Sequence, residues 1–435
     1  MDKIIEKTEA FLNSWHLGPD SIDMDQYCSQ FLQEMDAGLA GKNSSLAMIP
    51  SYTTTEVSIQ PGSSVIVLDA GGTNFRTCLV TFDEELVPHI SHFKKCGMPG
   101  VKHETSAQEF FKILANEVEP LIDLSDHIGF CFSYAAKITA DHDGIPIVFS
   151  KEIKAPEVIG MPVGASLLNE LAVRGHNITN KKVAVVNDTV ATLLAGKAAA
   201  GTTAYGGFVG FILGTGTNTA YVEKNSKITK AKINSNGSQI INVESGNFDL
   251  IVGPLDKRFI DSTKNPDDYH FEKVISGAYL GKFAHLVVSQ AIEEQILSER
   301  FSKLFATITP LDTTRMSHYL EMPHNKEYDL VKCITNEEDA TALYVILDAV
   351  IARSAKLTAV NLSAAVLKSE EGMNPRYPVC INADGTTYYK TKYLQRYTEQ
   401  YLYEFLERKH HRYTSFVKID DSPILGAALA GLSLA

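Results

Sequence analysis

The chain has 435 residues, 44% of them hydrophobic and 21% charged, a balance typical of a folded globular protein and not of a disordered one. Its formal net charge of −12 argues against nucleic acid or an anionic membrane surface as the main partner. Because the six cysteines form no C-x-x-C pair and no apolar stretch reaches the ~20 residues of a membrane span, we expect a reduced, cytoplasmic protein.

The first half of the chain is predicted to begin with helices and to continue with strands. Residues 1–48 have apolar side chains at helical spacing, and an extended stretch then ends in a Pro-Gly pair at 61–62. The β-branched run Val65–Leu68 predicts a buried strand that is interrupted at 69–74 and resumes at 78–82. The elements expected next are a helix over 106–122 and short strands over 127–134 and 145–150.

The second half is predicted to alternate strand and helix before it becomes mostly helical. A strand over 183–186 runs directly into a helix that ends near Gly201, and the polar pair Asn187-Asp188 lies at the junction. Residues 207–223 have the pattern of a strand, a glycine turn and a second strand. The remaining predicted elements are helices from about 270 to 410 and one strand within 377–390.

One tripeptide occurs twice, each time between two apolar runs. Gly72-Thr73-Asn74 recurs as Gly216-Thr217-Asn218. The first copy is preceded by an acid, Asp69, where the second has Leu213. We expect two structurally related halves, each of which presents a glycine turn to a common cleft.

The two glycine turns are predicted to bind phosphate. Glycine lets backbone N–H groups approach an anion closely, and Thr73 and Thr217 add hydroxyl donors. Asp69 would then hold Mg²⁺ through water, since Mg²⁺ gives up its hydration shell reluctantly. For either turn taken alone, an ordinary hairpin remains the alternative. The sequence contains neither a P-loop nor a G-x-G-x-x-G fingerprint.

An ordered set of motifs resembles the hexokinase family over roughly residues 30–430. The phosphate motifs are "LDAGGTNFR" and "ILGTGTNTAY", and the sugar-binding loops are "GFCFSYAA" and "VFSKEIKA". The catalytic segment is "VVNDTVATLLAG", and the two glutamate motifs are "NVESGNFD" and "FEKVISGAYLG". Each motif is weak alone, but their order along the chain is highly specific.

The resemblance implies an α/β, bilobed actin-like ATPase (ribonuclease H-like) fold with two domains around a cleft. A small domain would span 58–187 and include a helix at about 422–435, and a large domain would span 188–421 and include the segment 1–57. The implied activity is transfer of the ATP γ-phosphoryl group, with Mg²⁺, to the 6-hydroxyl of glucose or a related hexose, the first step of glycolysis. The hexose and ATP are the implied partners, and the oligomeric state stays open.

The resemblance also implies roles for individual residues. Asp188 would accept the hydroxyl proton, with a helix N-cap as the alternative reading of its position, and Lys151 would contact both the sugar and the transferring phosphoryl group. The implied sugar-binding residues are Ser133, Tyr134, Ser150, Lys151, Asn187, Asp188, Asn218, Glu244 and Glu272. The implied nucleotide-binding residues are Asp69, Gly71, Gly72, Thr73, Asn74, Arg76, Gly214, Thr215, Gly216, Thr217 and Gly426, although Arg76 could equally pair with a structural carboxylate.

The sequence departs from the family pattern at two places. Ala135 and Ser150 replace the usual proline and threonine of the sugar loops, which leaves the chemistry intact. Pro423 and Ile424 stand where the adenosine motif has small residues, so we expect relaxed purine selectivity, with ordinary adenine contacts as the alternative.

Two further functions remain as alternatives to a kinase. One is a non-catalytic sugar sensor, which the presence of Asp188 and Lys151 disfavours. The other is an actin- or chaperone-like ATPase, which the sugar-loop and glutamate motifs disfavour.

Overall fold

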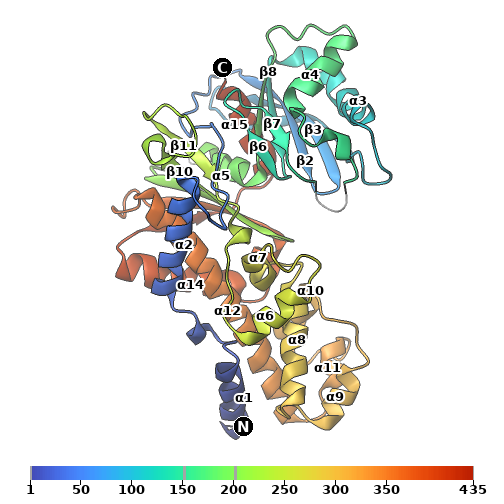
Figure 1. Cartoon of the computed structure of the whole chain (residues 1–435), viewed down its shortest axis with the longest axis vertical. Helices are drawn as coiled ribbons and strands as arrows, with labels where there is room; N and C mark the ends of the chain where they lie inside the picture. The colour runs from blue at the N-terminus through green and yellow to red at the C-terminus, as the bar shows by residue number, and fades with distance from the viewer. Residues whose placement is uncertain (1, 150–152, 200–202, 435) are drawn as a thin grey trace.

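The computed structural model describes residues 2–149, 153–199 and 203–434 and has two lobes, each built around a mixed β-sheet (Figure 1). The lobe at the top of Figure 1 holds a five-stranded sheet, and the lower part of the molecule is mostly helical. The predicted α/β class is therefore confirmed.

The five-stranded sheet has the order β4-β3-β2-β5-β8. The pairs β2–β3 and β3–β4 are antiparallel, whereas β2–β5 and β5–β8 are parallel. Helix α3 (Ala107–Val118) and helix α4 (Val163–Val173) belong to the same lobe. The strands are β2 (Ser64–Gly71), β3 (Asn74–Phe82), β4 (Pro88–Gly97), β5 (His127–Phe132) and β8 (Lys182–Val186).

A two-stranded ribbon follows β5. Strand β6 (Ala136–Ile138) pairs antiparallel with β7 (Gly144–Pro146). The strand predicted over 145–150 is therefore shorter than expected and ends at Pro146, because only the three-residue β6 lies beside it. Beyond this end, Ile147 is 57% exposed.

The six-stranded sheet has the order β1-β11-β10-β9-β12-β13. Five of its strands, β11-β10-β9-β12-β13, repeat the order and the directions of β4-β3-β2-β5-β8. This agreement is the structural relation between two halves that the repeated tripeptide predicted. The strands are β1 (Ile49–Pro50), β9 (Gly207–Leu213), β10 (Thr217–Lys224), β11 (Ser238–Asn242), β12 (Val379–Asp384) and β13 (Thr414–Val417).

Two helices cross between the sheets. Helix α5 (Asp188–Ala198) follows the five-stranded sheet in sequence but packs on β9, β10 and β12, whereas α15 (Ser422–Leu432) follows the six-stranded sheet and packs on β2, β5 and β8. At their contact, a Cβ on Gly426 would lie 1.8 Å from the carbonyl oxygen of Ala191, so only glycine allows this approach. The crossing agrees with the predicted domain division, which stays a prediction.

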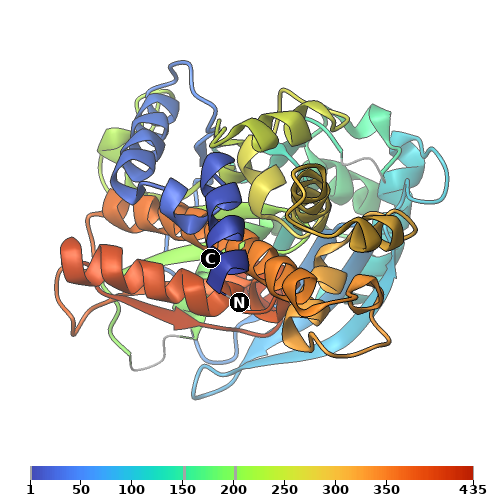
Figure 2. The ribbon, with the colours of Figure 1, turned by 90° about the horizontal axis from the view of Figure 1, so that it is seen from below.

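Helices cover the six-stranded sheet and extend beyond it. The longest, α12 (Glu337–Ser369), packs against α1, α2 and α14, and Figure 2 shows the blue amino-terminal helices beside the orange and red ones. The other helices are α1 (Asp2–Ser14), α2 (Met24–Leu39), α6 (Pro254–Asp261), α7 (His270–Ile275), α8 (Leu280–Glu293), α9 (Glu299–Phe305), α10 (Thr313–Glu321), α11 (Asp329–Cys333), α13 (Thr386–Lys390) and α14 (Leu394–Leu402). Short helical turns lie at Pro19–Ser21, Glu119–Leu124, Pro156–Val158, Asn225–Lys227, Ser245–Asn247 and Tyr403–Lys409.

None of the helices in the described ranges has the length and apolar character needed to span a bilayer.

Candidate active site

The first glycine turn closes the β2–β3 hairpin. Gly71 pairs with Asn74, so the turn itself consists of Gly72 and Thr73, both exposed. Gly72 has a φ of +56°, which favours glycine, and a Cβ added to it would meet no atom within 4 Å. The backbone conformation, and not crowding, therefore explains this glycine.

Asp69 lies buried in β2, directly opposite Arg76 in β3. The guanidinium of Arg76 forms an ion pair with the Asp69 carboxylate, so Arg76 has the carboxylate partner that was the alternative to a phosphate role. Burial raises the pKa of Asp69, and the Arg76 charge opposes that rise.

Asp188 is the first residue of α5, at the point where the lobes meet. The N-cap is its neighbour Asn187, whose Oδ1 accepts a hydrogen bond from the backbone N–H of Thr189 at 2.9 Å, so the N-cap reading of Asp188 is wrong. Burial raises the pKa of Asp188, while hydrogen bonds from Ser133 and Thr189 lower it. Ser133 is itself fixed by its backbone N–H, which donates to Ala70 of β2.

The second glycine turn closes the β9–β10 hairpin in a different register. Leu213 pairs with Thr217, which leaves a three-residue loop of Gly214, Thr215 and Gly216. The repeated tripeptides therefore lie at the tips of corresponding hairpins without occupying equivalent positions. A Cβ added to Gly216 would lie 2.5 Å from Oε2 of Glu272, so crowding explains this glycine.

Glu272 reaches the second turn from α7. Its Oε2 accepts a hydrogen bond from the backbone N–H of Thr217 at 3.1 Å. Burial raises the pKa of Glu272 to about 7, although the Thr217 hydrogen bond works in the opposite direction.

A chain of side-chain amides joins Glu244 to the start of α5. Nδ2 of Asn242 donates to Oε1 of Glu244 at 2.8 Å, and Nδ2 of Asn218 donates to Oδ1 of Asn242 at 2.8 Å. Asn218 also lies 3.5 Å from Oδ1 of Asn187. Burial raises the pKa of Glu244, and the Asn242 hydrogen bond lowers it. Sequence reasoning missed Asn242, and its place two residues before Glu244 in the same motif was the available signal.

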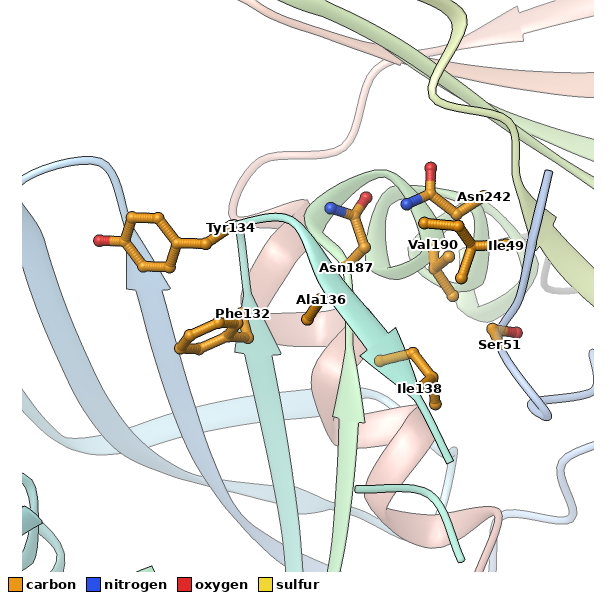
Figure 3. A pocket seen from close by; sticks show the side chains of 9 residues that line it. All are labelled: Ile49, Ser51, Phe132, Tyr134, Ala136, Ile138, Asn187, Val190 and Asn242. Carbon is orange, nitrogen blue, oxygen red and sulfur yellow. The ribbon is translucent and has the colours of Figure 1, made fainter. Parts of the chain in front are cut away.

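Asn187 and Asn242 also line a small cavity of about 10 Å³ (Figure 3). The two amides lie beside each other there, while the ring of Tyr134 points away from them. A space of this size holds about one water molecule and is too small for a hexose.

Two other predicted residues stand apart from the acids. The hydroxyl of Tyr134 donates to the carbonyl of Gly72 at 2.6 Å, so this buried ring braces the first turn, and its contact with a sugar stays a prediction. Gly426 has the packing role described above, and its contact with a nucleotide also stays a prediction. The predicted residues Ser150 and Lys151 lie outside the described residues.

The carboxyl-terminal departure has a structural explanation. Pro423 lies in the first turn of α15, where its missing N–H costs no helical hydrogen bond. Ile424 is buried in the core between the lobes and adds no bulk at an open surface. These positions do not support the expected bulk beside the nucleoside, and relaxed purine selectivity stays a prediction.

The structure brings four predicted acids into one region. Asp188 interacts electrostatically with Asp69 and with Glu244, and Glu244 interacts in the same way with Glu272. Among the described residues, no group of three or more His, Cys, Asp or Glu side chains could hold a metal ion by itself. The acids are thus close enough to act on one another, and any Mg²⁺ bound here would take further ligands from water or from a bound substrate.

Comparisons with known proteins agree with this geometry. Two family models, both described as hexokinase, match residues 8–198 and 208–433. The hexokinase of Schistosoma mansoni is 27% identical over 98% of this chain and 97% of its own, and hexokinase-3 of Mus musculus is 30% identical over 86% of this chain and 42% of its own. The structure of the Schistosoma mansoni enzyme complexed with glucose matches with a TM-score of 0.74 at 24% identity, over 99% of both chains. That match confirms the predicted bilobed actin-like fold.

Proposed function

The chain belongs to the hexokinase family and is a hexose kinase, and from that premise we propose that it transfers the γ-phosphoryl group of ATP, with Mg²⁺, to the 6-hydroxyl of glucose. The observation that carries this proposal is the cluster of Asp69, Asp188, Glu244 and Glu272 around the start of α5.

Asp188 is the proposed proton acceptor. Its carboxylate begins α5 between the two lobes, and the hydroxyl of Thr189 donates a hydrogen bond to its Oδ1 at 3.2 Å. Burial raises its pKa, which makes the carboxylate a better base than a solvated aspartate. Proton transfer from the 6-hydroxyl to Asp188 would leave an oxygen able to attack the γ-phosphorus.

Hexose recognition is assigned to two acids of the lower lobe and to the amides around the start of α5. Glu244 and Glu272 are partly exposed, so each keeps carboxylate oxygens that can accept hydrogen bonds from sugar hydroxyls. Asn187 and Asn218 lie beside them in the amide chain. Lys151 and Ser150 complete the proposal from the sequence alone.

Nucleotide phosphates are assigned to the two glycine turns. The exposed Gly72-Thr73 pair and the exposed Thr215 offer backbone N–H groups near their acids. Asp69 fits a metal that arrives with the nucleotide, because its buried carboxylate can accept a hydrogen bond from metal-bound water while Arg76 balances its charge. Bound Mg²⁺ would neutralise charge on the phosphates of ATP.

The domain division at residues 58–187 and 188–421 belongs to the same proposal and is supported by the crossing of α5 and α15. A cytoplasmic location is proposed from the composition, and the six cysteines are free in the structure.

A hexose panel tests the proposal. The protein is incubated with Mg²⁺ and ATP and, in parallel, with glucose, mannose, fructose or no sugar, and ADP and sugar phosphate are both quantified. We expect equal amounts of ADP and glucose 6-phosphate, little ADP without sugar, and loss of both products when EDTA removes Mg²⁺. ADP release independent of sugar would contradict the proposal.

A further inference from the structure

The side chain of Asn242 links a proposed sugar ligand to the rest of the site. Asn242 is the last residue of β11 and is buried, and Glu244 follows it with a φ of 58°. Within the described part of the chain, Asn242 is the one side chain that donates a hydrogen bond to the Glu244 carboxylate. Without the amide of Asn242, the carboxylate of Glu244 would accept no hydrogen bond from a described side chain.

The direction of the hydrogen bonds fixes the orientation of the amides. An ionised carboxylate only accepts hydrogen bonds, so the NH₂ group of Asn242 must face Glu244 and its oxygen must face Asn218. Asn218 is oriented in turn, because its Oδ1 accepts from the backbone N–H groups of Thr219 at 2.7 Å and Ser245 at 3.3 Å. The chain of amides therefore has one consistent polarity, which begins at the backbone and ends at Glu244.

The strand itself does not depend on this side chain. The backbone of Asn242 is aligned with Ala220 on one side and with Ile49 on the other, as part of regular antiparallel pairing. The side chain of Asn242 takes no part in this backbone pairing. It donates to Glu244, and it lines the cavity together with Asn187 (Figure 3). Its hydrogen bonds therefore serve the site and not the register of the sheet.

We infer that Asn242 is a positioning residue for hexose recognition, because it holds the Glu244 carboxylate in place. Through Asn218, it also connects this carboxylate to Asn187 at the start of α5. This inference rests on the proposed role of Glu244 as a hexose ligand. Asn242 does not touch the reacting atoms and acts through its neighbours.

The test replaces Asn242 by aspartate, which has the same shape but cannot donate to Glu244. Asn242→Asp sets two carboxylates 2.8 Å apart, the present distance between the two side chains. At pH 8 we expect the KM for glucose to rise about 10- to 100-fold, the usual worth of a hydrogen bond to a charged group, while the KM for ATP changes less than about threefold. The penalty should shrink as the pH falls and one proton becomes shared between the two acids.

The matched control is Asn225→Asp. Asn225 is partly buried near β10 and also donates to an oxygen, the carbonyl of Asn236 at 2.8 Å, but it has no contact with the acids of the site. We expect unchanged KM values and no new pH dependence from this variant. If Asn242→Asp does not fold, Asn242→Ala is measured with the same two substrates, and a selective rise in the glucose KM is again expected.

A swap of the two groups sharpens the test. The double variant combines Asn242→Asp with Glu244→Gln, so the new amide at position 244 can donate to the new carboxylate at position 242. The rise in the glucose KM should therefore be smaller than the sum of the rises for the two single variants. Additive penalties would overturn the inference, and so would an Asn242→Asp variant whose glucose KM is normal or whose two KM values rise equally. If Glu244→Gln alone leaves the glucose KM unchanged, the proposed role of Glu244 fails first, which distinguishes that failure from a failure of Asn242.

Discussion

The two glycine hairpins occupy corresponding places in two sheets of the same topology, yet they are supported in different ways. In β2–β3 the acid belongs to the hairpin itself, because Asp69 pairs with Arg76 across the two strands. In β9–β10 the position before the turn is the buried Leu213, and the acid, Glu272, comes from helix α7. The two halves therefore share their strand order, but the acid beside each turn comes from a different element.

The turns themselves differ for the same reason. The left-handed backbone of Gly72 lies in open space and favours glycine, whereas a side chain at Gly216 would displace the carboxylate of Glu272. The first turn therefore carries a local charge pair, and we expect it to serve the nucleotide alone. The second turn shares its acid with the hexose site, and we expect it to couple the two substrates.

The largest expected effect belongs to Asp188, which lies between the two hairpins. Asp188→Ala should lower kcat by ~10²- to 10⁴-fold, the usual contribution of a general base, because no other group at the start of α5 can take the proton. Steady-state kinetics should show a much smaller change in the glucose KM. A variant with near-normal kcat would remove Asp188 from the chemistry and leave both hairpins as binding elements only.

The next effect separates the two glycines directly. Gly216→Ala places a methyl group 2.5 Å from the Glu272 carboxylate, so we expect the KM for glucose to rise by about tenfold or more, together with the KM for ATP. Gly72→Ala meets no neighbouring protein atom, so we expect it to cost ~1 kcal/mol of stability through its positive φ and to raise the KM for ATP without raising the KM for glucose. Thermal unfolding and both KM values are measured for the pair. Equal kinetic damage from both variants would mean that the two turns bind phosphate in the same way.

The pH dependence of Glu272 gives a third test. Its pKa in the folded state is raised to about 7 from 4.5, so the folded protein binds the proton more tightly than the unfolded chain does. The stability that this proton confers is fully present below pH 4.5 and is lost as the pH rises through 7, at ~1.4 kcal/mol per pKa unit. Glu272→Gln should therefore raise the unfolding free energy at pH 8 and remove this part of the pH dependence. The outcome that contradicts the account is a Glu272→Gln variant with an unchanged pH–stability profile.

The smallest effect is expected at the first hairpin. Arg76→Met leaves Asp69 buried without its partner, but Arg76 is 30% exposed, so solvent screens part of the loss. We expect the KM for ATP to rise about fivefold, a cost of ~1 kcal/mol, with little change in the KM for glucose. Arg76→Lys, which keeps the charge, serves as the control and should recover part of the ATP affinity.

Much of this arrangement could be predicted from the sequence. The hairpins, the strand-to-helix junction at Asp188 and the two related halves follow from apolar runs broken by glycine and polar residues, which are local signals. Non-local contacts could not be predicted in the same way. The register of β9–β10, the burial of Ile424 and the approach of Glu272 to Gly216 depend on how distant segments pack. Asn242 lies two residues before Glu244, but its link through Asn218 to Asn187 joins segments that only the fold brings together.

The most direct test of the difference between the hairpins is one kinetic comparison. KM values for glucose and for ATP are measured at pH 8 for the wild type, Arg76→Met and Glu272→Gln under the same conditions. The account predicts that Arg76→Met raises the ATP value alone, and that Glu272→Gln raises chiefly the glucose value, because its carboxylate is the group that accepts sugar hydroxyls. If both variants raise both values by the same factor, the two hairpins do not differ in the substrates that they serve, and the account is contradicted.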